Sequence, residues 1–297
     1  MLSMLRLLTT LAIGLFCTQA AAQQAAWPKG PIRIVQPTET GTSVDRLIRG
    51  MQPFLAAELG VSIVVENRAG GMMTSGTRYV MDAPPDGNTI IAIPQPVWLG
   101  ARRLMKSPPS DWASLGAVNY DIDGIMASNG KYKTLLEVLR DAKAGKPMTF
   151  GAVAGIGGYV GHRAMLRTLQ LPSPKYVMYG SGGPLRIDVI GSHVDLSIAT
   201  HDGWLPLHTA GQAAADQIPN LSTLRSLLVT RAVKEKYPQR YERLVAAVKK
   251  TAANPAFLEW AKKSNYAIAY VEADEDLRQM ETLDKLAEQD PEAFGAR

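Results

Sequence analysis

Four glycine-rich loops carry the chemistry that this sequence offers most clearly, which is the binding of an anion. Each loop follows an expected strand and precedes an expected helix, so its free backbone N–H groups lie at the positive end of that helix. Glycine lets the backbone approach a ligand closely, and serine and threonine add hydroxyl donors. The four loops span Pro37–Ser43, Asn67–Gly76, Ala154–Gly158 and Tyr179–Pro184.

Four such loops at corresponding places in two halves of the chain predict a ligand cleft between two lobes, although a single glycine turn is usually structural. The third loop departs from the dinucleotide-binding pattern because Val160 stands where that pattern needs its last glycine, so no nicotinamide site is expected. His201 ends an expected strand that faces the same cleft. The candidate ligand-binding residues are Thr38, Glu39, Thr40, Gly41, Thr42, Ser43, Gly70, Gly71, Met72, Thr74, Ser75, Gly157, Gly158, Ser181, Gly182 and His201.

The motifs of several enzyme classes are missing from the sequence. It contains no His-Glu-x-x-His zinc motif, no pair of cysteines, no Gly-x-Ser-x-Gly elbow and no P-loop. The 4 histidines lack the spacing of metal ligands, and the adjacent His201 and Asp202 would point to opposite faces of a strand. We therefore expect no catalytic residue, no metal and no cofactor, and the sequence favours a binding protein over an enzyme.

The first residues have the pattern of an export signal. Arg6 precedes an apolar run that is too short to cross a bilayer, and Ala20-Ala21-Ala22 fits a small-residue cleavage site. Cleavage after Ala22 would leave residues 23–297 in the periplasm and would remove Cys17, the single cysteine. The mature chain would then form no disulfide and offer no thiol nucleophile.

Composition and charge are those of a globular protein without a nucleic-acid partner. The 297 residues are 46% hydrophobic and 20% charged, which excludes a disordered chain and a multi-span membrane protein. The formal charge of +5 comes from 32 basic and 27 acidic residues that are scattered along the chain. Nucleic-acid binding is therefore not indicated, and the mild positive charge would help to attract anions.

Strands and helices alternate in both halves of the sequence. In the first half, we expect strands over 31–37, 61–65 and 89–93 and helices over 44–59 and 75–81. In the second half, we expect helices over 134–144 and 160–169 and from Pro184, and strands over 148–152, 175–179 and 194–200. Helical stripes follow over 241–248, 257–261 and 277–286. This order predicts parallel sheets with helices on their faces.

Several blocks of the sequence are similar to those of a known receptor family. They are Trp27-Pro28, Pro31–Pro37, Gly41–Asp45, Val65–Gly71, Pro85–Thr89, Tyr179, Gly183-Pro184, Gly191 and Val194-Asp195. Over nearly all of its mature length, the chain resembles the Bug-type extracytoplasmic solute receptors of tripartite tricarboxylate transporters.

The resemblance implies an α/β fold of the two-lobed periplasmic binding protein type (a type II-like Venus flytrap), in which each lobe is a mainly parallel sheet flanked by helices. It implies a signal peptide over 1–22, a first domain of 23–122 plus 225–297, and a second domain of 123–224. It also implies that backbone amides of loops 38–43 and 70–75, together with waters bound there, hold a small carboxylate, while loops of the second domain contact the rest of the ligand. The implied partners are this carboxylate and the membrane permease subunits of a tripartite transporter, and the receptor is expected to be a monomer.

The chain departs from the family pattern in ways that concern the ligand. Glu39 adds a negative charge beside the expected carboxylate site, so either its side chain points to solvent or the ligand carries a cationic or amide group. Met72 and Met73 replace small residues, and Ala199 replaces an aspartate that pairs with amino groups. The region after Gly211 is shorter than in relatives, so a returning strand must lie within 213–231.

Other side chains near the loops each have two interpretations. Asp45 would either interact with the helix dipole or contact the ligand. Arg68 would form an ion pair with Glu66 or Asp86, or else belong to the site. The others either serve the ligand or simply pack or lie in solvent; they are Trp98, Trp204, His162, Arg163 and Arg186.

Two further functions stay open at the level of the sequence. The same pair of lobes would serve as a ligand-sensing co-receptor for a membrane sensor kinase. A periplasmic enzyme on this scaffold would need a nucleophile in the cleft, and Ser181 and Ser75 are the candidates.

Overall fold

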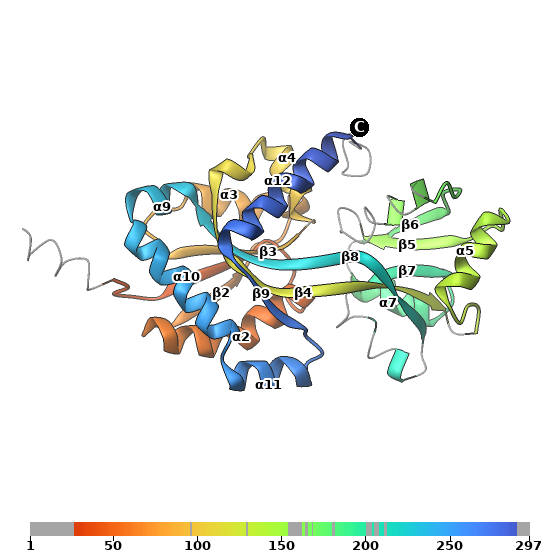
Figure 1. Ribbon diagram of the computed structural model, residues 1–297, viewed down its shortest axis with the longest axis horizontal. Coiled ribbons are helices and arrows are strands. Elements are labelled where there is room, and N and C mark those ends of the chain that lie inside the picture. The colour runs from red at the N-terminus through yellow and green to blue at the C-terminus, as the bar shows by residue number, and fades with distance from the viewer. Residues whose placement is uncertain are drawn as a thin grey trace, which may run out of the picture.

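The computed structural model describes residues 27–289 apart from residues 96, 129, 154–161, 164–165, 168, 180–181, 200–203, 205–207 and 211–212. The described chain forms two lobes that are joined by two long strands (Figure 1). The expected signal peptide over 1–22 lies outside the described residues.

A single sheet runs through both lobes. In the first lobe, its order is β2 (Ile63–Asn67), β1 (Ile32–Gln36), β3 (Thr89–Gln95), β8 (Ala213–Thr230) and β4 (Trp112–Ser128), and β9 (Ile268–Val271) also pairs with β4. In the second lobe, β7 (Leu196–Ala199), β5 (Thr149–Val153) and β6 (Lys175–Tyr179) continue from β4. Strands β1, β2 and β3 are parallel to one another, as are β5, β6 and β7. The sheet of each lobe is therefore parallel at its outer part and antiparallel where β4 and β8 join it.

Strands β4 and β8 pass from one lobe to the other as an antiparallel pair (Figure 1). The pairing runs from Trp112 opposite Thr230 to Ser128 opposite Ala213. It is interrupted between Ile122 and Gly124, whose partners on β8 change from Ser222 to Gln217. The ladder between the lobes thus contains a break in register, which locally disrupts the hydrogen bonding of the two strands.

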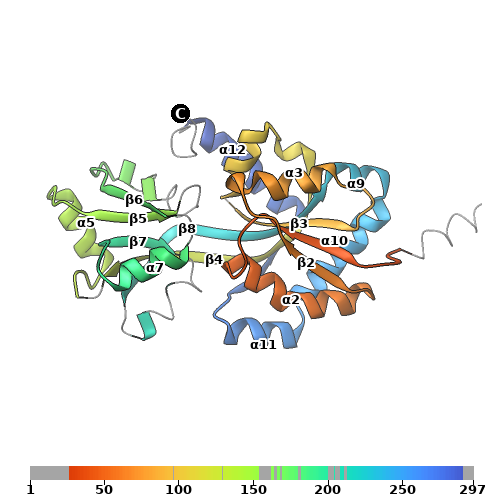
Figure 2. The same ribbon diagram turned by 180° about the vertical axis from the view of Figure 1, so that it is seen from behind.

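Helices cover both faces of the sheet in the first lobe. On one face, α2 (Ser43–Leu59), α9 (Arg231–Lys236), α10 (Pro238–Ala252) and α11 (Pro255–Lys263) bury their apolar stripes in the largest core. On the other face lie α3 (Thr74–Asp82), α4 (Trp98–Met105) and α12 (Ala273–Gln289), seen from behind in Figure 2. In the second lobe, α5 (Leu135–Lys143) and α7 (Gly182–Ile190) pack on two smaller cores.

Local sequence explains where these helices begin and end. Gly60 ends α2 in the left-handed conformation with φ of 73°, which glycine adopts without strain. The hydroxyl of Thr134 caps α5 by accepting from the amide of Glu137, as the sequence predicts. The side chain of Asn254 caps α11, whose first residue is Pro255.

Most of the expected strands and helices are confirmed, including the returning strand expected within 213–231, and one long strand of the sheet was not expected. The sequence pattern did not predict β4, which extends over Trp112–Ser128. The short region after Gly211 contains one continuous strand, β8, which carries the chain from the second lobe back between β3 and β4. Within the described residues, none of the helices combines the length and the apolar character that crossing a membrane requires.

Candidate ligand-binding site

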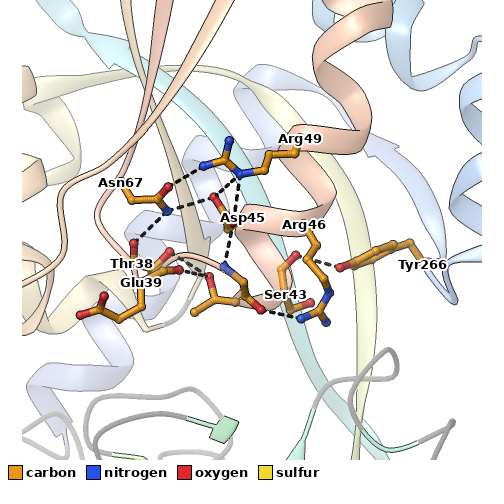
Figure 3. Close-up of polar contacts among 10 residues, drawn as sticks. Thr38, Glu39, Ser43, Asp45, Arg46, Arg49, Asn67 and Tyr266 are labelled. Atoms are coloured by element: carbon orange, nitrogen blue, oxygen red, sulfur yellow. Dashed lines mark hydrogen bonds and ion pairs between the residues drawn. The ribbon is translucent and has the colours of Figure 1, made fainter.

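The first loop follows β1 and is fixed by a buried carboxylate. Asp45, in the first turn of α2, is only 1% exposed. Its Oδ2 accepts a hydrogen bond of 2.9 Å from the backbone amide of Gly41, which has φ of 80° (Figure 3). Within the loop, the Thr42 hydroxyl donates to the carbonyl of Glu39 at 3.0 Å and lies 3.1 Å from the hydroxyl of Thr38. The loop is therefore held in one shape by its own residues and by Asp45.

Asn67 at the end of β2 connects this loop to the neighbouring strand. Its Nδ2 donates both to the carbonyl of Thr38, at 3.1 Å, and to Oδ1 of Asp45, at 2.9 Å. Its Oδ1 accepts from Nη2 of Arg49 at 2.7 Å, and Nε of Arg49 lies 3.1 Å from Asp45 (Figure 3). Burial alone would raise the pKa of Asp45, but the hydrogen bonds from Gly41, Arg49 and Asn67 outweigh it and hold this pKa below its usual range.

Ser43, the first residue of α2, is held by residues of the C-terminal part of the chain. Its carbonyl accepts from the hydroxyl of Tyr266 at 2.9 Å (Figure 3), and its hydroxyl accepts from Nη2 of Arg225 at 2.5 Å. Arg225 lies on β8 and also bonds to Asn119 on β4. The start of α2 is thereby linked to both of the strands that cross between the lobes.

The second loop has an unusual backbone. Gly70, Gly71, Met72 and Met73 all have positive φ, of 122°, 55°, 53° and 71°. Two consecutive methionines in this region are strained, because a side chain crowds the backbone there. The turn is closed by a hydrogen bond of 2.8 Å from the hydroxyl of Thr74 to the carbonyl of Gly71. Met72 is 56% exposed at the surface of this loop.

The two loops lie side by side at the carboxyl edge of the parallel strands. The amide of Arg68 donates to the carbonyl of Gln36 at 2.7 Å, which joins the start of the second loop to the residue before the first loop. A Cβ added to Gly76 in α3 would lie 2.9 Å from Cα of Pro37 and 2.9 Å from the carbonyl oxygen of Arg68. Helix α3 therefore approaches the backbone of both loops so closely that only glycine fits. The first turns of α2 and α3 converge on this edge, and in α3 the amides of Thr74 and Ser75 already donate to the carbonyls of Gly71 and Gly70.

The structure brings eleven of the predicted residues together in the first lobe: Thr38 to Ser43, Gly70 to Met72, Thr74 and Ser75. Glu39 is exposed and extends away from the cluster of Asp45, Asn67 and Arg49 (Figure 3). Gly182 lies apart from these loops, at the exposed start of α7 in the second lobe. Four predicted residues lie outside the described part of the chain, namely Gly157, Gly158, Ser181 and His201.

Other side chains singled out in the sequence have structural partners. Asp45 orders the first loop, and Arg68 forms the expected ion pair with Glu66, at 2.5 Å. Trp98 is buried in the first lobe, where its Nε1 donates to Thr77. Trp204 is also buried, and it packs with Leu185 and Val189 of the second lobe.

His162 is a core residue of the second lobe rather than a ligand for an anion. Its ring stacks on Phe150 with centroids 3.8 Å apart, and Nδ1 lies 3.1 Å from the hydroxyl of Tyr176. Burial lowers the pKa of His162 to about 3, so the ring is neutral at physiological pH. A neutral, stacked imidazole offers no charge to a carboxylate.

Sequence reasoning missed the role of Asn67, which was treated as part of a glycine-rich loop. No local pattern reveals this role, because its partners Thr38 and Asp45 lie 29 and 22 residues away in the chain. Among the described residues, no group of three or more histidine, cysteine or acidic side chains is arranged to hold a metal ion. The arrangement can offer backbone amides of the first turn of α2 to an anion.

Curated relatives share sequence with the chain, among them the two that follow, whereas no protein-family model matches it. The UPF0065 protein in the gbd 5' region of Cupriavidus necator is 26% identical over 236 residues, which are 73% of this chain and 70% of that protein. Protein BugT of Bordetella pertussis is 28% identical over 210 residues, which are 66% of this chain and 63% of BugT. These relatives confirm the resemblance to the Bug family that the sequence blocks predict.

Solved structures of periplasmic binding proteins share the fold. The periplasmic binding protein BugD superposes with a TM-score of 0.75 at 18% identity, over 91% of this chain and 99% of BugD. A TctC solute-binding protein from Polaromonas gives 0.67 at 18% identity, over 88% and 97%. MatC of Rhodopseudomonas palustris, solved with bound malate, gives 0.72 at 17% identity, over 90% and 100%. The chain thus has the two-lobed fold of periplasmic binding proteins, as the sequence predicts.

Proposed function

We propose that this chain, which resembles the Bug-type receptors in sequence and in fold, is a periplasmic solute-binding protein that captures a small carboxylate between its two lobes. One observation carries the proposal: two loops meet at the carboxyl edge of β1 and β2, each in front of the first turn of a helix, and Asp45 and Asn67 hold the first of them in place. In sheets of this kind, ligands bind outside the carboxyl ends of the parallel strands. Helix N-termini there favour an anion.

The chemistry of the loops fits a carboxylate better than a metal or a cation. The hydroxyls of Thr42 and Thr74 hold the loops in shape by donating to the carbonyls of Glu39 and Gly71, and the amides of the first turn of α2 are donors for an anion. The carboxylate of Asp45 already accepts from Gly41, Arg49 and Asn67, so its charge is balanced inside the lobe. The exposed Glu39 extends away from this cluster, which leaves the donors facing an anion (Figure 3).

The two crossing strands support a hinge. We place the first domain at residues 23–122 plus 225–297 and the second at 123–224, because the register of β4 and β8 breaks between Ile122 and Gly124. At such a break, a small number of residues can absorb the change in backbone φ and ψ angles that occurs when the two lobes close on a ligand. Loops of the second lobe, including Gly182 and the predicted Gly157, Gly158, Ser181 and His201, would then complete the site.

The proposal also covers the cellular location, the oligomeric state and the partners of the protein. The mature receptor acts as a monomer in the periplasm after removal of residues 1–22, performs no catalysis, and delivers its ligand to the permease subunits of a tripartite transporter. The names of its structural neighbours support the periplasmic location and the binding role, since they describe periplasmic and solute-binding proteins, one of them with malate bound.

Isothermal titration calorimetry on residues 23–297 tests the proposal. The panel holds mono-, di- and tricarboxylates, aromatic acids and amino acids, each titrated with and without a chelator. We expect saturable binding of a carboxylate with one site per chain and no effect of the chelator. Turnover of the bound acid, abolished by Ser75→Ala or Ser181→Ala, would instead identify an enzyme and overturn the proposal.

A further inference from the structure

Arg225 is a buried cation on one of the two strands that cross between the lobes. It lies on β8 and is 1% exposed. Its Nη1 donates to Oδ1 of Asn119, which is its register partner on β4, and its Nη2 donates to the hydroxyl of Ser43 at 2.5 Å. The planar fork of an arginine can hold partners on two different elements at once. Arg225 therefore ties both crossing strands to the first residue of α2, directly after the first ligand loop.

The segment between α11 and β9 completes this network of polar contacts. The hydroxyl of Tyr266 donates to the carbonyl of Ser43 at 2.9 Å (Figure 3), and its ring centroid lies 5.5 Å from Cζ of Arg225. The carbonyl of Ala267 accepts from Nδ2 of Asn119 at 2.6 Å. Breaking one bond of a buried polar network costs the desolvation free energy of the group that is left without a partner. We therefore expect the Arg225 network, formed by Arg225, Asn119, Ser43 and Tyr266, to keep one arrangement.

The Arg225 network holds a short part of the crossing ladder that has an irregularity at each end. Four successive pairs, from Asn119 opposite Arg225 to Ile122 opposite Ser222, keep a regular register. The register shifts between Ala117 and Asn119, and it breaks again after Ile122. An irregularity of this kind disrupts the ladder locally and is a place where the strands can bend. The crossing strands therefore have two neighbouring places to bend, and the network lies at the first of them.

We propose that Arg225 is a positioning residue for ligand capture. It holds the four pairs against the start of α2, so the strands do not bend before Asn119 and the lobes close by bending at the break after Ile122. The inference rests on the proposed function, since it needs lobes that close over the first loop. A site that is held in one geometry before the ligand arrives loses less conformational entropy on binding. The second lobe therefore meets the first loop in the same geometry at each closure.

Hydrogen exchange of the ligand-free protein (residues 23–297), followed by mass spectrometry, tests the inference. The informative segments are 117–122 of β4, 222–226 of β8 and 38–43 of the first loop. Residues 32–35 of β1, in the core of the same lobe, report on global unfolding. In Arg225→Met, we expect exchange in the three segments to rise about tenfold relative to this reference, because the bonds to Asn119 and Ser43 are lost.

Arg102→Met is the matched control. Arg102 is also a buried arginine of the first lobe, at 3% exposure, but it lies in α4 on the other face of the sheet and bonds to Asp284 and to the carbonyl of Ser107. Its loss should destabilise the lobe without excess exchange in the three segments. Arg225→Lys keeps the charge without the fork, so its excess should be smaller than that of Arg225→Met. If Arg225→Met does not fold, Ser43→Ala, which removes only the bond to α2, takes its place and should show the same excess.

The distance between the lobes gives a second readout, which a loss of stability alone would not change. Removal of residues 1–22 leaves no cysteine, so Asp82→Cys in α3 and Lys143→Cys in α5, both at exposed positions, can carry a pair of spin labels. In the ligand-free protein, we expect a broader distribution of label distances in Arg225→Met than in the wild type or in Arg102→Met, because the lobes then bend at two places.

The outcomes separate the inference from the proposed function. Equal changes in exchange in Arg225→Met and Arg102→Met would overturn the inference, and so would an unchanged distribution of label distances in Arg225→Met. Both measurements use ligand-free protein, so they do not depend on which acid binds. Failure of every acid in the calorimetric panel to bind would contradict the proposed function alone.

Discussion

The carboxylate of Asp45 accepts a hydrogen bond of 2.9 Å from the backbone amide of Gly41, four residues earlier in the chain. This contact explains how an acidic residue lies in a lobe that is proposed to bind an anion. Asp45 uses its charge to shape the loop and to balance Arg49, which lies 3.1 Å away. The amides of the first turn of α2 are then left for the ligand.

Replacement of Asp45 by asparagine should loosen the first loop. The new amide would place a donor against the amide of Gly41 or against Arg49, and one of the charge-assisted bonds would be lost. We expect a loss of about 2 kcal/mol in the free energy of unfolding and a clear fall in carboxylate affinity. Urea unfolding and calorimetry measure the two effects. Asp82→Asn, at an exposed position of α3, is the control, and equal effects of both variants would contradict the role of Asp45.

Gly76→Ala should push α3 away from the first and second loops, which it contacts closely. The added Cβ would lie 2.9 Å from backbone atoms of Pro37 and Arg68, so the helix must move. We expect destabilisation by about 1–3 kcal/mol together with weaker binding. In Gly100→Ala the same change is made in α4, where nothing lies within 4 Å, and stability should stay level or rise by about 0.5–1 kcal/mol. Thermal unfolding that ranks the two variants in the opposite order would refute the close approach.

Gly71→Val should remove binding and leave the protein folded. Gly71 has φ of 55°, and an added Cβ would lie 2.4 Å from Oγ1 of Thr74, so valine must change the shape of the second loop. Gly145→Val is the matched control, because Gly145 also has a positive φ, of 69°, but has open space around it in the second lobe. Circular dichroism checks the fold and calorimetry the affinity. Wild-type affinity in Gly71→Val would show that the second loop does not hold the ligand.

Asp276 should make the protein less stable as the pH rises from 4 to 7. This residue of α12 is fully buried, and Ser114 and Ser226 donate to it at 2.6 and 2.7 Å. Burial raises its pKa to about 6 despite these bonds, whereas the unfolded value is about 3.9. The folded state therefore binds more protons in this window. The stability that the protonated group contributes is full below about pH 4 and is lost as the pH rises through about 6.

Asp276→Asn tests this dependence. The amide keeps the shape of the side chain but does not ionise, so the variant should lose this contribution to the pH dependence. The contribution is on the order of 3 kcal/mol in full and about 1.5 kcal/mol between pH 5 and pH 7.5, because about half of it is already lost at pH 5. Urea unfolding of both proteins at pH 5 and pH 7.5 measures it. If the two proteins change in parallel between these values, Asp276 is not the group responsible.

Features of the fold that depend on residues close together in the sequence could be predicted, and features that depend on distant residues could not. The spacing of apolar residues, together with helix-ending and strand-ending residues, was enough to predict β1, α2 and β3. Gly60 ends the helix, and prolines flank the first strand. Strand β4 escaped prediction because its residues near Gly116 and Asn119 are small or polar and yet buried, so they show no alternation. Its partner β8 lies about a hundred residues away, and its other partners, β7 and β9, are also distant in the sequence, so only long-range pairing stabilises it.

The candidate site shows the same limit. The loops were visible as glycine-rich segments, and Arg68 with Glu66 could be paired because they are neighbours in the sequence. The contacts that fix the site are long-range: Asn67 reaches Thr38, and Arg225 reaches Ser43 across 182 residues.

A thermal-shift screen of residues 23–297 against the carboxylate panel, with Gly71→Val alongside, tests the central claim most directly. A ligand at a hundred times its dissociation constant adds about 2.7 kcal/mol to the stability of the folded state, which gives a clear rise in melting temperature. We predict such a rise for at least one carboxylate with the wild-type protein and none with Gly71→Val. A well-folded wild-type protein that responds to no carboxylate would contradict the claim that its paired loops form an anion site.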